Sequence, residues 1–399
     1  MAAFTSVRVP EMKYILQNMP EPGSTVVVGL SGGVDSTLTA LLLKEKGCRV
    51  VGVTMSLWDG HLKEVQAEKK MHDSCYGPDE KEDIEQCRTF CAEHGIDYHV
   101  IDVSEEYNTQ VLEYFKNEYR SGRTPNPCIR CNLFIKFGAL LEGIKKLNIS
   151  FDYFCTGHYA AVVRPDSGIW GSEKTPCMIA TAQDQSKDQT YFLYRLPSQI
   201  LEKVRFPLAL MKKEDVFRIA RENNLAAAER SESQDFIGSE YFEQLFSDKA
   251  SVPGYFVDLN GKVLGRHRGI EHYTIGQRRG LGVSGSEAYY VQKIDAEKNQ
   301  VVLATKDFLG GDTLIADDFV WPGGIEPDKV FEGHVKIRLR SKDALATVER
   351  YSPPESDRYE YKGQPWKITF AQKQNAITPG QSAVIYLDNV VAGGGVIVR

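Results

Sequence analysis

The chain has 399 residues, with 48 Lys and Arg against 54 Asp and Glu, and a formal net charge of −6. This length predicts two or three domains, and the acidic balance requires any surface for a polyanion to be a local basic patch. No apolar run reaches the roughly 18 residues of a membrane span, and the N-terminus has no secretion signal. We therefore expect a cytoplasmic protein with no membrane partner, whose eight cysteines are reactive thiols, metal ligands or core residues.

The first clear pattern is a strand, a glycine-rich loop and a helix between Val26 and Gly47. Residues 26–30 predict a buried strand, and leucines at helical spacing follow in residues 36–46. Between them, the hexapeptide SGGVDS would aim backbone N–H groups and the positive end of a helix dipole at one point, which suits a phosphate. Asp35 would repel phosphates unless a divalent metal lies between them. The stretch therefore predicts ATP with Mg²⁺, and the alternative is an ordinary strand-to-helix turn.

Further buried strands are predicted over residues 50–55, 98–103 and 151–155. Met55 and Gly157 fall at or just after the carboxyl ends of two of them, where nucleotides bind in open α/β sheets. Met55 would equally suit the core. The sequence thus predicts an α/β fold built on a parallel sheet.

Three cysteines in the first quarter of the chain carry no clear signal of their own. Cys75 ends a polar surface segment and has no partner at a recognisable spacing. Cys87 and Cys91 share one face of a helix predicted over residues 79–94, so we interpret them as small core residues rather than ligands.

Cys128 and Cys131 follow two prolines in the segment TPNPCIRCN. The prolines interrupt any helix, and the residues from 131 onward are amphipathic with helical spacing. The pair would then lie at a helix N-terminus, where the dipole and the N–H groups favour the thiolate. This arrangement predicts reactive sulfur, and the alternative is two incidental buried cysteines.

Short β segments dominate from about residue 252 to the end. Residues 257–263 and 289–302 predict hairpins, and residues 334–342 form a basic segment. Strand alternation there would place Lys336, Arg338, Arg340 and Lys342 on one face. Such a face favours a polyanion such as tRNA, although a charged edge strand that resists aggregation would look the same.

The hexapeptide SGGVDS resembles the PP-loop of the ATP pyrophosphatases, which adenylylate an oxygen and release pyrophosphate. It lacks the lysine with which a Walker loop grips the β and γ phosphates, so attack at the α phosphate is implied. Nearly the whole chain resembles the tRNA-specific 2-thiouridylases of the MnmA type. The matching stretches are VVVGLSGGVDS, GRTPNPCIRCN, TGHYA, KDQTYFLYRL, FPLALMKKEDVFRIA, HYTIGQRRGLG and AITPGQSAVIY followed by GGGVI.

This resemblance implies a PP-loop (adenine nucleotide alpha hydrolase-like) α/β domain, a small central domain and a C-terminal β-barrel that helps to hold tRNA. We place these domains at residues 1–205, 206–310 and 311–399. The implied reaction is adenylylation of O2 of a wobble uridine by ATP, followed by replacement of this oxygen with sulfur carried on cysteine. The product is 2-thiouridine.

The resemblance also assigns site residues, by matching motifs. Cys131 matches the family's first catalytic cysteine. The implied ATP-binding residues are Gly29, Leu30, Ser31, Gly32, Gly33, Val34, Asp35, Ser36, Met55 and Gly157. The implied tRNA-binding residues are Asn126, Pro127, Cys128, His158, Lys187, Asp188, Gln189, Arg338, Leu339 and Gln381.

Two departures from the family pattern concern the sulfur chemistry. Cys128 stands where the family usually has Asp after Asn-Pro. The second catalytic cysteine of the family, which carries a persulfide, falls in a stretch like SQDICFIG. This chain reads SQDFIG at residues 233–238, and its last cysteine is Cys177.

Three hypotheses for the sulfur route stay open. Cys128 and Cys131 could divide the work, one bearing a persulfide from a cysteine desulfurase or sulfur-relay protein and the other resolving it as a disulfide. Alternatively, Cys128, Cys131 and Cys155 could hold a [4Fe–4S] cluster whose open iron binds free sulfide. The third hypothesis is a catalytically impaired paralogue that binds tRNA under nucleotide control.

Overall fold

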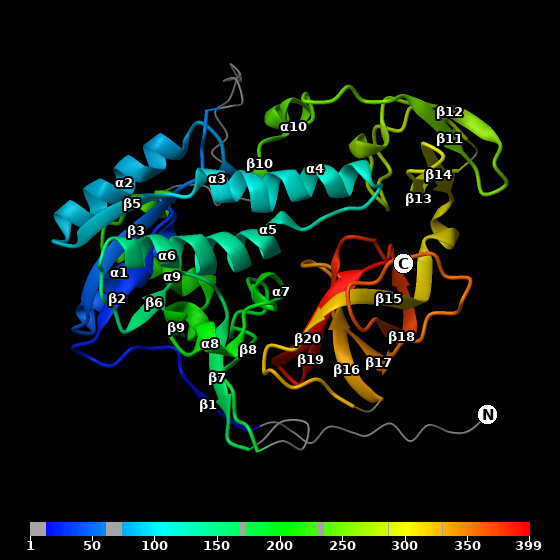
Figure 1. Cartoon of the computed structure of the whole chain (residues 1–399). Helices are drawn as coiled ribbons and strands as arrows, with labels where there is room; N and C mark the ends of the chain where they lie inside the picture. Colours follow the sequence, from blue (N-terminus) through cyan, green and yellow to red (C-terminus); the bar gives the residue numbers. More distant parts are fainter. Residues whose placement is uncertain (1–12, 61–73, 168–172, 230–234, 286, 329) are drawn as a thin grey trace.

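The computed structural model describes residues 13–60, 74–167, 173–229, 235–285, 287–328 and 330–399 (Figure 1). Its N-terminal part is built on a five-stranded sheet in the order β5-β3-β2-β6-β9, in which every pairing is parallel. The strands are β2 (Thr25–Gly29), β3 (Arg49–Ser56), β5 (Asp97–Asp102), β6 (Tyr153–Cys155) and β9 (Val204–Arg205). The predicted α/β fold class is confirmed.

Helices cover both faces of this sheet, because its strands are apolar on both sides. Alternate residues of β2 point to opposite faces, so Val26 and Val28 belong to one core cluster and Val27 to another. The first cluster packs against α1 (Val34–Glu45), α2 (Glu80–Glu93) and α9 (Lys213–Glu222).

The second face is covered by two long, partly π-helical segments. One comprises α3 (Ser104–Tyr107), η1 (Asn108–Leu112) and α4 (Glu113–Arg120), and the other α5 (Pro127–Arg130), η2 (Cys131–Ala139) and α6 (Leu140–Lys146). Both contribute buried residues to the core cluster that contains Val27. Cys87 and Cys91 of α2 are buried in the opposite cluster, which confirms that they are core residues.

The central part contains a four-stranded sheet in the order β12-β11-β14-β13. Its strands are β11 (Gly254–Val257), β12 (Val263–His267), β13 (Tyr290–Asp295) and β14 (Gln300–Ala304). Both predicted hairpins are confirmed, since β11 pairs antiparallel with β12 and β13 with β14. Gly261 adopts a φ of 83° in the first turn, a conformation that favours glycine.

The C-terminal strands close into an antiparallel barrel in the order β20-β15-β18-β17-β16-β19, and β19 pairs back with β20 (Figure 1). They are β15 (Gly310–Val320), β16 (Phe331–Lys336), β17 (Ala344–Arg350), β18 (Trp366–Asn375), β19 (Ser382–Leu387) and β20 (Val390–Ile397). The predicted barrel is therefore confirmed.

Strands from the N-terminal half extend the barrel sheet. β8 (Met178–Ala180) pairs with β20 at Val390, and β7 (Ala161–Pro165) and β1 (Tyr14–Leu16) follow outward. The barrel also shares the core cluster of the second sheet face, through Val384, Tyr386 and Val391. The barrel and the N-terminal half of the chain therefore share one core cluster and one sheet.

The remaining short elements connect these units. They are β4 (Ser74–Tyr76), α7 (Thr190–Leu193), α8 (Ser198–Leu201), η3 (Pro207–Leu210), η4 (Ala226–Glu229), β10 (Asp235–Ile237), α10 (Ser239–Leu245), η5 (Ile270–His272) and η6 (Lys306–Phe308). In the described part of the chain, no helix has the length and apolar character needed to cross a bilayer.

The predicted four-cation strand face is wrong. Strand β16 ends at Lys336, and a turn follows in which the Ser341 N–H donates to the carbonyl of Arg338 at 3.2 Å. The Ser341 hydroxyl donates to the same carbonyl at 2.9 Å. Because these bonds bend the chain directly after the strand, Arg338 and Arg340 do not alternate with Lys336 along it.

Candidate active site

The SGGVDS loop folds as the sequence predicts, between β2 and α1. Gly32 has a φ of 76°, which few other residues adopt, and Gly33 is the N-cap of the helix. The Ser36 hydroxyl donates to the carbonyl of Gly33 at 3.0 Å and accepts from the N–H of Ser31 at 3.2 Å. These bonds hold the loop in a tight curve at the positive end of the α1 dipole.

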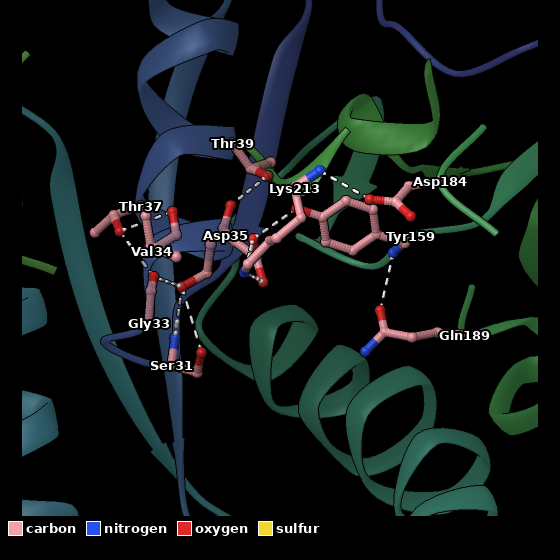
Figure 2. Close-up of polar contacts among 11 residues, drawn as sticks. Ser31, Gly33, Val34, Asp35, Thr37, Thr39, Tyr159, Asp184, Gln189 and Lys213 are labelled. Carbon is pink, nitrogen blue, oxygen red and sulfur yellow. Dashed lines mark hydrogen bonds and ion pairs between the residues drawn. The ribbon is translucent and has the colours of Figure 1, made fainter. Parts of the chain in front are cut away.

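Asp35 is held by a lysine and a tyrosine that are distant in sequence. The Nζ of Lys213, on α9, lies 2.7 and 2.8 Å from the two carboxylate oxygens. The hydroxyl of Tyr159 donates to Oδ1 of Asp35 at 3.0 Å, and Figure 2 shows the three side chains converging. Lys213 is buried whereas the Asp35 side chain is 31% exposed, so the lysine neutralises Asp35 from the protein side and leaves part of the carboxylate open.

Gly157 allows the turn after β6 to pack against the start of α1. A Cβ atom at this position would lie 2.7 Å from the carbonyl carbon of Asp35, which is closer than real contacts allow. Glycine is therefore required here by close backbone approach. The structure thus brings two predicted ATP-binding segments, distant in sequence, into contact.

These segments line an open cavity of about 630 Å³. Predicted ATP-binding residues at its wall include Ser31, Asp35, Ser36, Met55 and Gly157. The helix that follows the cysteine pair closes the opposite side, through Lys136 and Leu140. The nucleotide loop and the cysteine-bearing helix therefore face one cavity.

Cys128 and Cys131 lie at the start of this helix, as predicted. Asn126 is its N-cap, with a side-chain oxygen that accepts from the N–H of Ile129 at 3.4 Å, and Pro127 is its first residue. Burial nevertheless raises the pKa of Cys131 to about 11, with Lys136 opposing this rise. The expected lowering of this thiol pKa by the helix dipole is thus outweighed by desolvation.

The structure does not bring Cys155 to this pair. Its side chain is fully buried in the core cluster of α1 and α9, whereas Cys131 packs against the cluster on the other face of the sheet. Among the residues that the structure describes, no three His, Cys, Asp or Glu side chains are grouped so that they could hold a metal ion. Cys155 as third cluster ligand is therefore not supported, because strand alternation turns it to the wrong face.

Several predicted tRNA-binding residues have structural contacts of their own. His158 is buried and its Nδ1 lies 2.7 Å from the hydroxyl oxygen of Thr156; burial and Lys136 hold its pKa well below the usual value. Buried Asp188 accepts from the Ala182 N–H at 3.1 Å, and burial raises its pKa.

Two more of these residues position backbone near the site. Gln189 accepts from the N–H of Tyr159 at 2.9 Å, and Gln381 donates to the carbonyl of Thr124 at 2.9 Å, just before Asn126.

The other predicted tRNA-binding residues lie in the turn after β16 and before α7. Arg338 donates to the carbonyls of Ala376, at 2.8 Å, and of Ile275, at 3.4 Å, and so joins the barrel to the central part. Leu339 packs against the core cluster of the second sheet face, and Lys187 lies in the turn closed by its N–H and the carbonyl of Asp184. Their contact with tRNA stays a prediction.

Sequence reasoning missed three residues of the site: Lys136, Tyr159 and Lys213. Tyr159 and Lys213 do occur in the motifs TGHYA and FPLALMKKED, but neither motif reveals that both side chains reach Asp35. Lys136 lies five residues after Cys131 within η2, and only the fold shows that it lines the nucleotide cavity.

Family models match the chain in three consecutive blocks. They are described as tRNA methyl transferase HUP domain (residues 24–238), tRNA methyl transferase PRC-barrel domain (residues 241–305) and aminomethyltransferase beta-barrel domain (residues 311–397). The tRNA-specific 2-thiouridylase MnmA of Endomicrobium trichonymphae is 44% identical over 375 residues, which cover 94% of this chain and 98% of that protein. The chain belongs to the tRNA-specific 2-thiouridylase family.

Other relatives in the 2-thiouridylase family agree in length and similarity. MnmA of Carboxydothermus hydrogenoformans is 40% identical, and the matched region covers 93% of this chain and 97% of that protein. MnmA 1 of Syntrophus aciditrophicus is 40% identical, and the matched region covers 93% of this chain and 92% of that protein. The solved tRNA thiolase NcsA of Methanococcus maripaludis, with its [4Fe–4S] cluster, aligns at a TM-score of 0.32 with 17% identity over 57% of this chain and 64% of that one. This likeness is too low to carry an argument about the site.

Proposed function

We propose that the protein is an ATP-dependent tRNA-uridine 2-sulfurtransferase that forms 2-thiouridine at the wobble position through an adenylylated uridine. The observation that carries this proposal is that the nucleotide cavity and the cysteine pair share one helical segment. Lys136 lines the cavity of the SGGVDS loop, and Cys131 begins the same helical segment. An oxygen activated in the cavity would then lie near the thiols that replace it. Relatives named tRNA-specific 2-thiouridylase match almost the whole chain.

The nucleotide-binding part of the proposal rests on the loop and its neighbours. The backbone of Ser31, Gly32 and Gly33 would hold the ATP phosphates at the α1 N-terminus. Mg²⁺ is usually held by phosphate oxygens and one or two carboxylates, and the exposed edge of Asp35 fits this donor set. Mg²⁺ would neutralise phosphate charge, while Lys213 and Tyr159 orient the Asp35 carboxylate.

The tRNA-binding part gains support from a second cavity, of about 1220 Å³, between the helices and the barrel. It is lined by Asn126 together with Arg123, Arg130 and Arg195. Arginines pair with phosphates and stack on bases, and the tyrosines in this wall add stacking surfaces. Glu118, Asp317 and Asp318 also line this cavity. Arg123 pairs with Glu118 and Arg195 with Asp318, so a phosphate would compete with these carboxylates. The support is therefore the arginine and tyrosine side chains beside the predicted position of the target base, not an excess of positive charge.

The sulfur source is proposed to be a cysteine desulfurase or a sulfur-relay protein, and the compartment the cytoplasm, where reductants keep thiols available. A [4Fe–4S] cluster would need a third ligand other than Cys155. None of the described residues favours the catalytically impaired paralogue.

The test combines a strain that lacks the gene with an activity assay of the purified protein. Mass spectrometry of tRNA from a strain that lacks this gene should show wobble 2-thiouridine lost, and the purified protein should restore it with tRNA, Mg²⁺-ATP and a desulfurase with cysteine. AMP and pyrophosphate should accumulate in step with product. Unchanged 2-thiouridine in the deletion strain, or product formation without ATP cleavage, would contradict the proposal.

A further inference from the structure

The position of the missing persulfide cysteine can be located on β10. The stretch SQDFIG lacks an Ile-Cys pair between Asp235 and Phe236, and residues 235–237 form this strand; Ser233 and Gln234 lie outside the described residues. Strand β10 pairs in parallel with β4, with Asp235 opposite Ser74 and Ile237 opposite Tyr76. Cys75 lies between these two paired positions, on the strand adjacent to the shortened one.

Cys75 is also close to the catalytic cysteine pair. Tyr76 stacks on Tyr107 of α3, with ring centroids 5.2 Å apart, and α3 packs against η2, which begins at Cys131. Burial raises the pKa of Tyr107 well above its ordinary value, and Cys131, Cys75 and Cys128 raise it further by charge interaction. Cys75 likewise contributes to the raised pKa of Cys131. Tyr107 is therefore within electrostatic range of three thiols, which come from two segments of the chain.

The three thiols differ in accessibility. Cys75 is exposed, whereas Cys128 and Cys131 are of intermediate exposure and the other five cysteines are buried. The thiol that receives sulfur from a donor protein must be accessible, because the sulfur atoms of the two proteins have to come into contact. A resolving thiol needs only to reach its neighbour inside the site.

We propose that Cys75 is the persulfide-carrying catalytic residue of this enzyme, in place of the cysteine that is absent from β10, and that Cys131 resolves it. This inference rests on the proposed function. It replaces the division of labour between Cys128 and Cys131 with one between Cys75 on β4 and Cys131 on η2, and it leaves Cys128 at the predicted position of the target base.

The sulfur transfer balances as follows. A persulfide protein gives its outer sulfur to the Cys75 thiolate and leaves as a thiolate. The Cys75 persulfide then attacks C2 of the adenylylated uridine, a sulfur–carbon bond forms, and the carbon–oxygen bond to AMP breaks. Cys131 then attacks the Cys75 sulfur. The bond between this sulfur and the sulfur attached to C2 breaks, which leaves 2-thiouridine, and a Cys75–Cys131 disulfide forms. The proton of Cys131 passes to the ring nitrogen that lost one on adenylylation, and a dithiol reductant restores both thiols.

The test uses the full chain with tRNA, Mg²⁺-ATP and a cysteine desulfurase supplied with [³⁵S]cysteine. Cys75→Ser should lower thiolated tRNA at least 100-fold while tRNA-dependent pyrophosphate release stays within threefold of wild type. After incubation of the protein with the desulfurase and [³⁵S]cysteine, the label should reside on the peptide that contains Cys75. Cys131→Ser should trap a reductant-sensitive protein–tRNA adduct, and the double variant Cys75→Ser/Cys131→Ser should not.

Two controls separate this role from a structural one. Ser74→Ala changes the neighbouring residue of β4, and Cys48→Ala removes a buried thiol of the opposite core; both should retain thiolation within threefold. Thiolation by Cys75→Ser at the wild-type rate, or label on the Cys128 peptide, would overturn the assignment of Cys75. Absence of tRNA-dependent pyrophosphate release in the wild type would instead overturn the proposed function.

Discussion

Lys213 places its Nζ 2.7 and 2.8 Å from the two carboxylate oxygens of Asp35, so helix α9 supplies the counter-charge for the acidic residue of the nucleotide loop. The sequence predicts a divalent metal at this carboxylate, because only a cation would let it lie beside phosphates. The structure adds a second cation on the protein side. The two are compatible, since Lys213 approaches from the buried side and the carboxylate is partly exposed.

Lys213→Met should weaken ATP binding about tenfold and lower the free energy of unfolding by about 1–2 kcal/mol, because Asp35 loses its counter-charge while staying partly solvated. Calorimetric ATP titration and urea unfolding measure the two effects. Lys212→Met is the matched control, since Lys212 is mostly exposed and 3.8 Å from Glu214. Wild-type ATP affinity in Lys213→Met would show that the Asp35–Lys213 pair is not part of the phosphate site.

Gly157→Ala should lower the free energy of unfolding by about 1–3 kcal/mol and weaken ATP binding, because its Cβ would overlap the Asp35 backbone at 2.7 Å and push α1 aside. Thermal unfolding with and without ATP measures both effects. In Gly310→Ala, the added Cβ would lie no nearer than 3.6 Å to a neighbouring atom, so stability should hardly change. Equal stability of the two variants would mean that the turn moves without cost.

Stability should fall below about pH 6.5, in part through His158. Its pKa is held well below the ordinary value by burial, so on acidification the unfolded chain takes up a proton that the folded chain does not. At pH 5.5 this difference costs about 1.4 kcal/mol for one such histidine. His158→Gln should therefore reduce the stability lost between pH 7.5 and 5.5 by about this amount, as measured by urea unfolding.

Two other histidines, His267 and His272, also have pKa values lowered by burial, so the variant should retain part of the acid sensitivity. An unchanged pH dependence in His158→Gln would show that His158 binds its proton equally well in the folded and the unfolded chain.

Asn126→Ala should lower the free energy of unfolding by about 1 kcal/mol, because the N–H of Ile129 loses its side-chain cap at the helix that begins beside Cys128. Asn126→Ser keeps a capping oxygen and should lose less than half of this amount. Urea unfolding and the rate of Cys128 alkylation report on the helix start. If the Ala and Ser variants behave alike in both measurements, the cap does not hold this helix.

Local sequence patterns were sufficient to predict much of the fold. The strand, SGGVDS loop and helix order of residues 26–46 requires only apolar spacing and glycine, and both hairpins follow from turn residues between β segments. The basic stretch after Lys336 was misjudged because alternation was assumed to continue through Ser341, whose hydroxyl and N–H close a turn instead. The thiol pKa at Cys131 was misjudged because spacing shows a helix start but not its burial.

The sequence by itself determined the nucleotide loop, the cysteine pair at a helix start and the absence of a cysteine after Asp235, since each is a matter of residue type and spacing. Only the tertiary structure decided which distant side chains meet: Lys213 with Asp35, Lys136 with the cavity, and β4 with β10, which brings Cys75 beside the vacated position. It also turned Cys155 away from the other thiols. The physical reason is that strand pairing and alternation fix the face and the neighbour of each side chain, and both depend on segments far apart in the chain.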